Sequence, residues 1–282
     1  PEIAVICGPA ADRVRAAKAL PDTMQGIFVE KPLAHSLVEA EKVAHLLVPR
    51  AAVCQVGYNL RFSSSLQQFR HLVQSHLLGD VLSVRAETGQ YLPDWRPGRD
   101  YRTTVSAQKK TGGGVLRELS HEIDYLQWIF GDFRWVSAWT GSQSSLDVDV
   151  EDTAHLTCGF GERARAGGLV AQVNLDFVRR DRTRTITAVC SEGTLRWDGI
   201  AQKVEKRSPT DSSWQSLFAE GSGGSSTYEI QWDSFEASMA GQSEPLVTVA
   251  DGLSVLAAID AIERSAMKGG ETMMVERSIS RT

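Results

Sequence analysis

The sequence lacks several features that would assign it to common functional classes. It contains no run of about 18 apolar residues, so we expect no membrane-spanning helix, and no charged-then-apolar leader opens the chain. Its 30 Lys and Arg against 35 Asp and Glu give a net charge of -5, without a basic block. Because nucleic-acid-binding proteins concentrate basic residues on one face, we expect neither nucleic acid nor an anionic membrane as a partner.

Cysteine is scarce and scattered. The four cysteines form no C-x-x-C pair; they are Cys7, Cys54, Cys158 and Cys190. Disulfide scaffolds and zinc sites need clustered cysteines, so we expect free thiols in a reducing compartment and a cytoplasmic location. The six histidines show no H-x-H or H-E-x-x-H spacing, so a metal-dependent hydrolase or lyase has no ligand motif and we predict no metal site.

A glycine-rich turn for a dinucleotide is also absent. The pattern G-x-G-x-x-G/A, which seats a pyrophosphate on a helix N-terminus, does not occur before residue 10 or at the start of any expected helix. The chain opens with Pro1 and then the apolar residues 3–7, which indicate a strand buried on both faces of a parallel sheet. Such a strand would leave a bare edge, so we expect a preceding segment to be missing. Either the chain is a fragment of a longer product, or it is a degenerate protein that binds a cofactor weakly.

The residues that are present predict two kinds of architecture in succession. Strands at 3–7, 27–29 and 53–58 alternate with helices at 10–20 and 36–47, the pattern of βαβ units and a parallel sheet. Further along we expect strands at 81–91, 135–140, 154–160, 169–178, 183–190 and 194–197, a loop at 208–226, and helices at 63–78, 116–130, 229–239 and 250–267. The expected fold class is therefore α/β plus α+β: a parallel sheet, then a large, mostly antiparallel sheet backed by helices.

Two short motifs follow the ends of the first two expected strands. Open parallel sheets bind ligands outside the carboxyl ends of their strands, and Gly8-Pro9 and Glu30-Lys31-Pro32 lie at such ends. Pro32 biases Lys31 toward an extended backbone, so the lysine would project from the strand tip into a crevice. A surface lysine beside a turn is the alternative interpretation.

A histidine on the helix after three glycines is the second chemical element. His121 projects almost opposite the apolar stripe of that helix, which comprises Leu119, Ile123, Leu126 and Phe130. Glu118 and Asp124 each lie three residues from His121 and could orient its imidazole. An ordinary solvated helix face is the alternative, but Gly112-Gly113-Gly114 permit the close backbone approach that a functional site uses.

A strand-end lysine and a helix-borne histidine suit hydride chemistry. Oxidation of an alcohol requires a base for the hydroxyl proton, and the imidazole, with an ordinary pKa of about 6.5, fits that role. The Lys31 ammonium would stabilise the developing alkoxide, and a nicotinamide would supply the redox chemistry.

These motifs, in this order, resemble the Gfo/Idh/MocA oxidoreductases. The resemblance lies in Cys7-Gly8-Pro9, Phe28–Leu33, Gly57–Phe62, Gly112–Asp124 and Glu244–Gly252. It implies that residues 1–60 are the C-terminal half of a Rossmann domain that binds NAD or NADP. It implies that residues 61–282 form a substrate-binding and oligomerisation domain, which pairs through its open sheet into a homodimer or homotetramer.

The resemblance also assigns roles to individual residues. It implies that Lys31 and His121 are catalytic with assistance from Glu118, although Arg117 stands where many members carry an acidic residue. The implied cofactor-binding residues are Gly8, Pro9, Glu30, Lys31, Trp95 and Arg96, and the implied substrate-binding residues are Tyr58, Arg61, Tyr101 and Asp124. Residues 89–97 and 100–102 resemble a branch of surface-sugar biosynthesis proteins.

The expected function is therefore hydride transfer between NAD or NADP and a hydroxyl or keto carbon. The substrate would be a sugar, cyclitol or nucleotide-sugar. The alternative is a catalytically degenerate oligomeric scaffold or ligand-binding protein of the same fold, which the missing glycine turn suggests.

Overall fold

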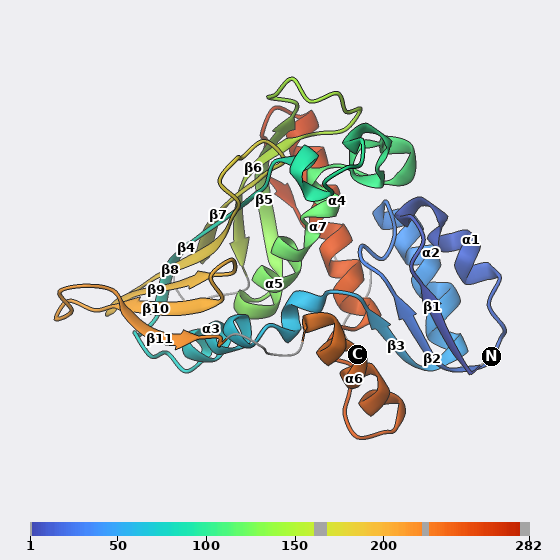
Figure 1. The fold of residues 1–282 in the computed structure, drawn as a ribbon, viewed down its shortest axis with the longest axis horizontal. Coiled ribbons are helices and arrows are strands. Elements are labelled where there is room, and N and C mark those ends of the chain that lie inside the picture. Colours follow the sequence, from blue (N-terminus) through green and yellow to red (C-terminus); the bar gives the residue numbers. More distant parts are fainter. Residues whose placement is uncertain (1, 161–167, 222–225, 277–282) are drawn as a thin grey trace.

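The computed structural model describes residues 2–160, 168–221 and 226–276. Within these residues the chain forms a small parallel sheet and a large mixed sheet, and helix α7 (Val249–Met267) runs between them (Figure 1). None of the helices in the described ranges is long and apolar enough to cross a membrane.

The small sheet has three parallel strands, as the βαβ pattern predicts. The strands stand in chain order and are β1 (Ile3–Ile6), β2 (Met24–Val29) and β3 (Ala51–Val56). Helices α1 (Arg13–Lys18) and α2 (Leu37–Leu47) connect them. The Ser36 hydroxyl caps α2 by accepting a hydrogen bond from the Glu39 amide at 3.3 Å. The first strands therefore end side by side at one edge, Ile6 opposite Val29.

The expectation that the first strand is buried on both faces is wrong. Ile6 is buried, but Ile3 and Val5 are 38% and 48% exposed. The reason is that Ile3 and Val5 point to one face of the small sheet and Ile6 to the other, and the face at Ile3 and Val5 is only partly covered in the described part of the chain.

The large sheet has nine strands, and all but one of its neighbouring pairs are antiparallel. Its order is β11-β10-β9-β8-β4-β7-β6-β5-β12, with β4 and β7 parallel. The strands are β4 (Val81–Gly89), β5 (Phe133–Gly141), β6 (Thr153–Phe160), β7 (Leu169–Asp176), β8 (Thr183–Cys190), β9 (Gly193–Asp198), β10 (Lys203–Arg207), β11 (Gln215–Ala219) and β12 (Met273–Met274).

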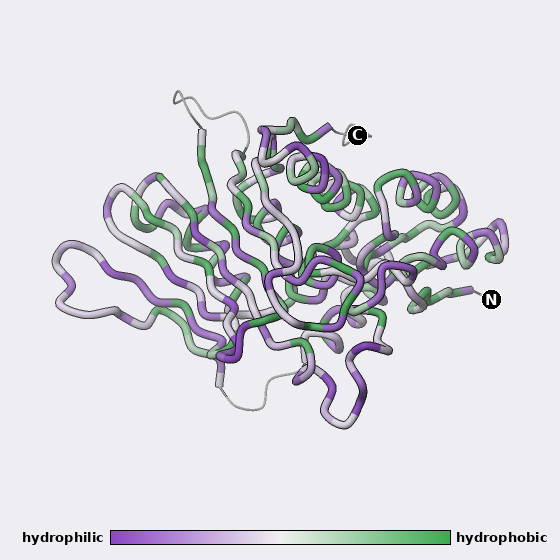
Figure 2. The backbone as a smooth tube through the Cα atoms, turned by 90° about the horizontal axis from the view of Figure 1, so that it is seen from above, coloured by the Kyte–Doolittle hydropathy of each residue, from purple (hydrophilic) through white to green (hydrophobic). Residues whose placement is uncertain are grey.

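One face of the large sheet is covered by helices, and the other is open. The helices are α3 (Ser64–Gln74), α4 (Val115–Glu118), α5 (Ser120–Phe130) and α7. Along β7 every second residue, from Leu169 to Leu175, is buried and the residues between are not. Apolar and polar positions accordingly alternate along the strands in Figure 2. The predicted open sheet backed by helices is confirmed.

Two predictions about local structure are wrong. Residues 208–226, expected to be a loop, contain β11, and β10 stands just before them; residues 222–225 lie outside the described residues. Val204 is buried in β10, but its neighbours are not, so this edge hairpin carries little of the apolar pattern that marks a strand. The helix expected at 116–130 is broken into α4 and α5 at Leu119, whose φ and ψ are -95° and 27°.

Short 3-10 segments complete the connections between these elements. They are Ala10–Asp12, Val48–Arg50, Asn59–Phe62, Leu92–Trp95, Tyr101–Thr103, Val105–Ala107 and Lys109–Thr111.

The last helices return to the small sheet. Phe235 on α6 (Thr227–Met239) packs edge-on against Phe28 of β2, with ring centroids 5.7 Å apart. Gly26 of β2 leaves room for this helix, because an added Cβ there would lie 2.8 Å from Phe235. The C-terminal part of the chain therefore fixes the small sheet in place beside the large one.

Candidate active site

A cavity of about 300 Å³ lies where the tip of β2, the helix pair α4–α5 and the helix-facing side of the large sheet meet. Five residues selected from the sequence line it: Lys31, Trp95, Arg96, Glu118 and His121. The strand-end lysine and the post-glycine histidine therefore share one cavity.

Lys31 lines this cavity, and a hydrogen bond to the protein backbone holds its side chain in position. Its Nζ donates a hydrogen bond of 2.8 Å to the backbone carbonyl of Glu118. The neighbouring Glu30 carboxylate accepts a hydrogen bond from the Lys31 amide at 3.3 Å, and burial raises the pKa of Glu30. Gly57 leaves space for that carboxylate, because an added Cβ would lie 2.9 Å from Glu30 Oε2. An ammonium has three donors, so one contact to Glu118 leaves donors for a bound oxygen.

His121 stands in the first turn of α5 and is half-buried. Burial, followed by the positive charges of Lys31 and Arg184, holds the pKa of His121 well below its ordinary value. The imidazole is therefore neutral at pH 7 and can accept a proton. Its Nδ1 is buried and has no hydrogen-bond partner among the described residues.

Tyr58 lies behind His121, outside the cavity lining. It is fully buried, and its ring meets the imidazole edge-on with centroids 5.5 Å apart. Its hydroxyl and the Ser120 hydroxyl are 3.4 Å apart, and burial raises the pKa of the phenol. Tyr58 therefore supports the ring of His121 from the protein side.

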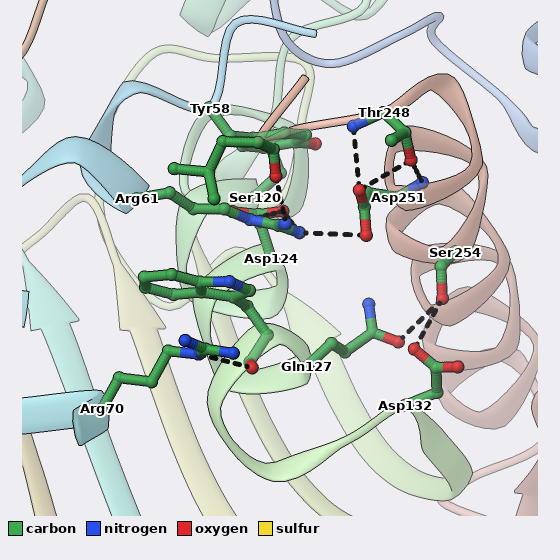
Figure 3. A network of polar contacts seen from close by, with 12 residues as sticks. Tyr58, Arg61, Arg70, Ser120, Asp124, Gln127, Asp132, Thr248, Asp251 and Ser254 are labelled. Carbon is green, nitrogen blue, oxygen red and sulfur yellow. Dashed lines mark hydrogen bonds and ion pairs between the residues drawn. The ribbon is translucent and has the colours of Figure 1, made fainter. Parts of the chain in front are cut away.

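Arg61 and Asp124 form a buried ion pair outside the cavity lining (Figure 3). The Arg61 Nη2 and Asp124 Oδ1 atoms are 2.6 Å apart, and the two side chains are 4% and 1% exposed. Arg61 also contacts Asp251 of α7 at 3.3 Å and donates a 3.1 Å hydrogen bond to the Leu246 carbonyl. Burial raises the pKa of Asp124 to about 6, although Arg61 opposes that shift. This network links the segment around Arg61 to α5, the helix that carries His121, and to α7.

The remaining predicted residues lie around the cavity without lining it. The Tyr101 hydroxyl accepts a hydrogen bond from the Asp147 amide at 3.1 Å, on the far side of the loop that carries Trp95. Gly8 is exposed and Pro9 half-buried, at the open end of β1 next to the tip of β2.

The three glycines make close approaches to the protein's own chain. Gly112 and Gly114 have φ of +83° and +108°, the left-handed side that glycine tolerates. An added Cβ at Gly113 would lie 2.7 Å from the Ser106 carbonyl oxygen, and one at Gly114 would clash with the carboxylate of Glu151. That carboxylate accepts a 3.1 Å hydrogen bond from the Leu116 amide at the start of α4. The glycines therefore fix where the His121-bearing helix pair begins.

Sequence reasoning missed several residues of the lining. They are Thr88, Gly89, Gln90, Leu119, Arg182, Thr183, Arg184, Ile200 and Tyr228. A signal existed for two of them. Arg182 and Arg184 share the alternation of buried Ile186 on β8, so they continue its helix-facing side beyond the core. Ile200 and Tyr228 come from a turn and from the start of α6, and no local pattern marks them.

The cavity holds no cluster of metal ligands. Among residues 2–160, 168–221 and 226–276, no group of three or more His, Cys, Asp or Glu could hold a metal ion.

Comparison with known proteins identifies the large sheet domain. Residues 66–196 match the model of the GFO/IDH/MocA C-terminal domain. The chain is 24% identical over 153 residues to an inositol 2-dehydrogenase of Salmonella typhimurium, covering 54% of the chain and 42% of that protein. It is 27% identical over 194 residues to a D-xylose dehydrogenase of Paenarthrobacter nicotinovorans, covering 64% and 49%. The chain therefore spans about half the length of the curated relatives it matches.

Solved structures share the fold along nearly the whole chain. A levoglucosan dehydrogenase in complex with NADH superposes with a TM-score of 0.81 at 21% identity, covering 98% of this chain and 80% of that one. The WlbA dehydrogenase of Bordetella pertussis, in complex with NADH and UDP-GlcNAcA, gives 0.76 at 19% identity, covering 98% and 79%. At these identities the likeness establishes the fold.

Proposed function

We propose that the chain, whose residues 66–196 match the GFO/IDH/MocA C-terminal domain, is the catalytic part of an NAD- or NADP-dependent dehydrogenase. A hydride passes between the nicotinamide and a hydroxyl or keto carbon of a sugar, cyclitol or nucleotide-sugar. The observation that carries this proposal is the meeting of Lys31 and His121 in one cavity. The names of the relatives, an inositol and a xylose dehydrogenase, support the same substrate class.

The chemistry follows from the charge states of the two residues. Neutral His121 accepts the hydroxyl proton, which its lowered pKa permits at pH 7 and below. The Lys31 ammonium, steadied by the Glu118 carbonyl, donates to the same oxygen and stabilises the negative charge that develops there. Proton removal and charge stabilisation are thus divided between two groups that enter the cavity from different elements.

The residues at the tips of β1 and β2 fit the nicotinamide end of a dinucleotide. An added Cβ at Gly8 would meet no atom within 4 Å, so the end of β1 is open, and Lys31 follows the neighbouring strand. Gly8, Pro9 and Glu30 would hold the cofactor there, with Trp95 and Arg96 across the cavity. The nicotinamide, when bound, accepts the hydride. The glycine turn that would seat the pyrophosphate is absent from this sequence.

We further propose that cofactor binding and substrate binding are assigned to separate parts of the chain, as the sequence suggests. Residues 1–60 carry the cofactor side, and residues 61–282 carry the substrate side and the oligomer contact. The open face of the large sheet pairs copies of the chain into a homodimer or homotetramer. The four cysteines are all free, which suits a cytoplasmic location.

The test is turnover by the intact gene product. In Lys31→Met and His121→Asn we expect kcat to fall by about two orders of magnitude or more, with the thermal unfolding midpoint unchanged. Lys42→Met is the matched control, because Lys42 is an exposed lysine of α2 paired with Glu39. Near-normal kcat in both site variants would refute the proposal. Absence of NADH binding in a fluorescence titration would favour the catalytically degenerate scaffold.

A further inference from the structure

The charge of the cavity is opposite to the charge of the chain. The sequence carries a net charge of -5, yet the lining contains four cations, namely Lys31, Arg96, Arg182 and Arg184, against one carboxylate, Glu118. Uncompensated cations around a small cavity favour an anionic ligand, because they attract it during approach and bind it where little water competes.

Arg184 is held in place as a fixed cation. Its Nε donates a 2.8 Å hydrogen bond to Glu122 Oε1, and the Glu122 side chain is fully buried behind it. Gly199 leaves room for the aliphatic part of the Arg184 side chain, because an added Cβ at residue 199 would lie 3.0 Å from Arg184 Cδ. Glu122 engages Nε, and the structure gives the terminal nitrogens of Arg184 no partner among the described residues. Its planar fork is therefore oriented before any ligand arrives.

Arg182 and Arg96 add two further cations to the lining of the cavity. Both are exposed, and neither has an ion-pair partner in the described ranges of the chain. Arg182 lies two residues before Arg184, immediately before β8, and so shares its side of the sheet. Since Glu122 balances Arg184, these two guanidinium groups and Lys31 leave the cavity positive even with Glu118 ionised.

We propose that the substrate carries an anionic group, a carboxylate or a phosphate, and that Arg182 and Arg184 bind it. The inference rests on the proposed function, because Lys31 and His121 then act on a hydroxyl elsewhere on the same molecule. A guanidinium recognises carboxylate and phosphate alike through paired N–H donors. A neutral polyol would leave the charge of Arg182 uncompensated in the complex.

Calorimetric titration of the full chain with four probes tests the proposal. The probes are D-glucuronate, D-glucose 6-phosphate, D-glucose and myo-inositol. We expect one or both anionic probes to bind at least tenfold more tightly than the neutral ones, and the stronger of the two tells carboxylate from phosphate. Raising the NaCl concentration from 50 to 500 mM should weaken the binding of the anionic probes only.

Arginine variants assign the effect to residues. Arg182→Gln should lower the affinity for the preferred anionic probe by about tenfold and change the affinity for D-glucose by less than twofold. Arg207→Gln, an exposed arginine at the end of β10, is the control and should change neither. Arg184→Gln would strand the Glu122 charge, so it is made together with Glu122→Gln, and its folding is checked by thermal unfolding.

The outcomes separate this inference from the proposed function. Equal or tighter binding of neutral sugars, no binding of either anionic probe, or unchanged anionic affinity in Arg182→Gln would overturn the inference. So would a loss of NADH affinity alone in that variant, because the arginines would then serve the cofactor. NADH production from a neutral sugar would leave the dehydrogenase proposal standing. Anionic binding without NADH production from any probe would refute the dehydrogenase and retain the anion site.

Discussion

At the scale of single residues, Arg61 and Asp124 show how a motif residue can serve the site from a distance. Both were predicted to bind substrate, and both lie outside the cavity lining, in a buried ion pair that also reaches Asp251. The pair anchors α5 three residues after His121. In this position its contribution is to hold the base in place.

We expect Arg61→Met to destabilise the fold strongly. It leaves the carboxylate of Asp124 buried and unpaired, an effect of about 3–5 kcal/mol in the free energy of unfolding. The double variant Arg61→Met with Asp124→Leu should lose much less, because it removes both charges together. Urea unfolding at pH 7 measures the three proteins, and a double variant no more stable than the single one would contradict this account.

The sequence marks Lys31 and His121 but not Arg184. The lysine follows a buried strand at the edge where parallel sheets bind ligands, and the histidine follows three glycines, so local pattern indicates both. Arg184 stands at the start of a strand, where a polar residue is ordinary. Its role depends on Glu122, 62 residues earlier, and on Gly199 in a later turn. Such a site becomes visible only when the sheet brings β8 against α5.

At the scale of elements, the turn before α4 decides where His121 stands. Gly113 lies against the backbone carbonyls of Val105 and Ser106, which cannot move aside like a flexible side chain. Gly113→Ala should therefore lower the free energy of unfolding by about 1–3 kcal/mol and lower kcat as well, because α4 and α5 shift together.

The matched control for this turn is Gly8→Ala. An added Cβ there meets no atom within 4 Å, and its φ is not in the left-handed region, so stability should change by less than about 0.5 kcal/mol. Thermal and urea unfolding compare the two variants. If Gly113→Ala proved as stable as Gly8→Ala, the turn would not position the helix pair.

The elements that sequence predicts are those whose apolar spacing is strong. The βαβ segment, α3, α6 and α7, and strands β4 to β9 lie close to their expected positions because one face of each is buried. The hairpin of β10 and β11 was missed because an edge position buries Val204 and little else. The break at Leu119 was missed because the apolar stripe continues across it.

At the scale of the whole molecule, the cavity exists because segments that are far apart in the sequence meet there. Lys31 comes from the first sheet, His121 from the helices of the second, and Tyr228 from α6, which packs on the first sheet again. α7 lies between the two sheets and contacts Arg61 through Asp251. The closing helices thus set the distance between the small sheet and the large sheet.

The open face of the large sheet carries an exposed tryptophan near one edge of the sheet, on β5. Trp139 of β5 is 45% exposed and lies against His155 of β6, with ring centroids 6.0 Å apart. Tryptophan is enriched at protein–protein interfaces. This observation supports assembly of copies through this face.

Trp139→Asp should therefore lower the molar mass of the particle in solution. A carboxylate on a face that is buried between two copies would be desolvated without a partner, which weakens their association. Light scattering coupled to size exclusion measures the mass at several protein concentrations. Val38→Asp is the control, because Val38 is 60% exposed on α2, away from the large sheet. A parent protein that is monomeric, or a Trp139→Asp variant that keeps the parent's mass, would place the contact elsewhere, and the open face would then need another explanation for its exposed tryptophan.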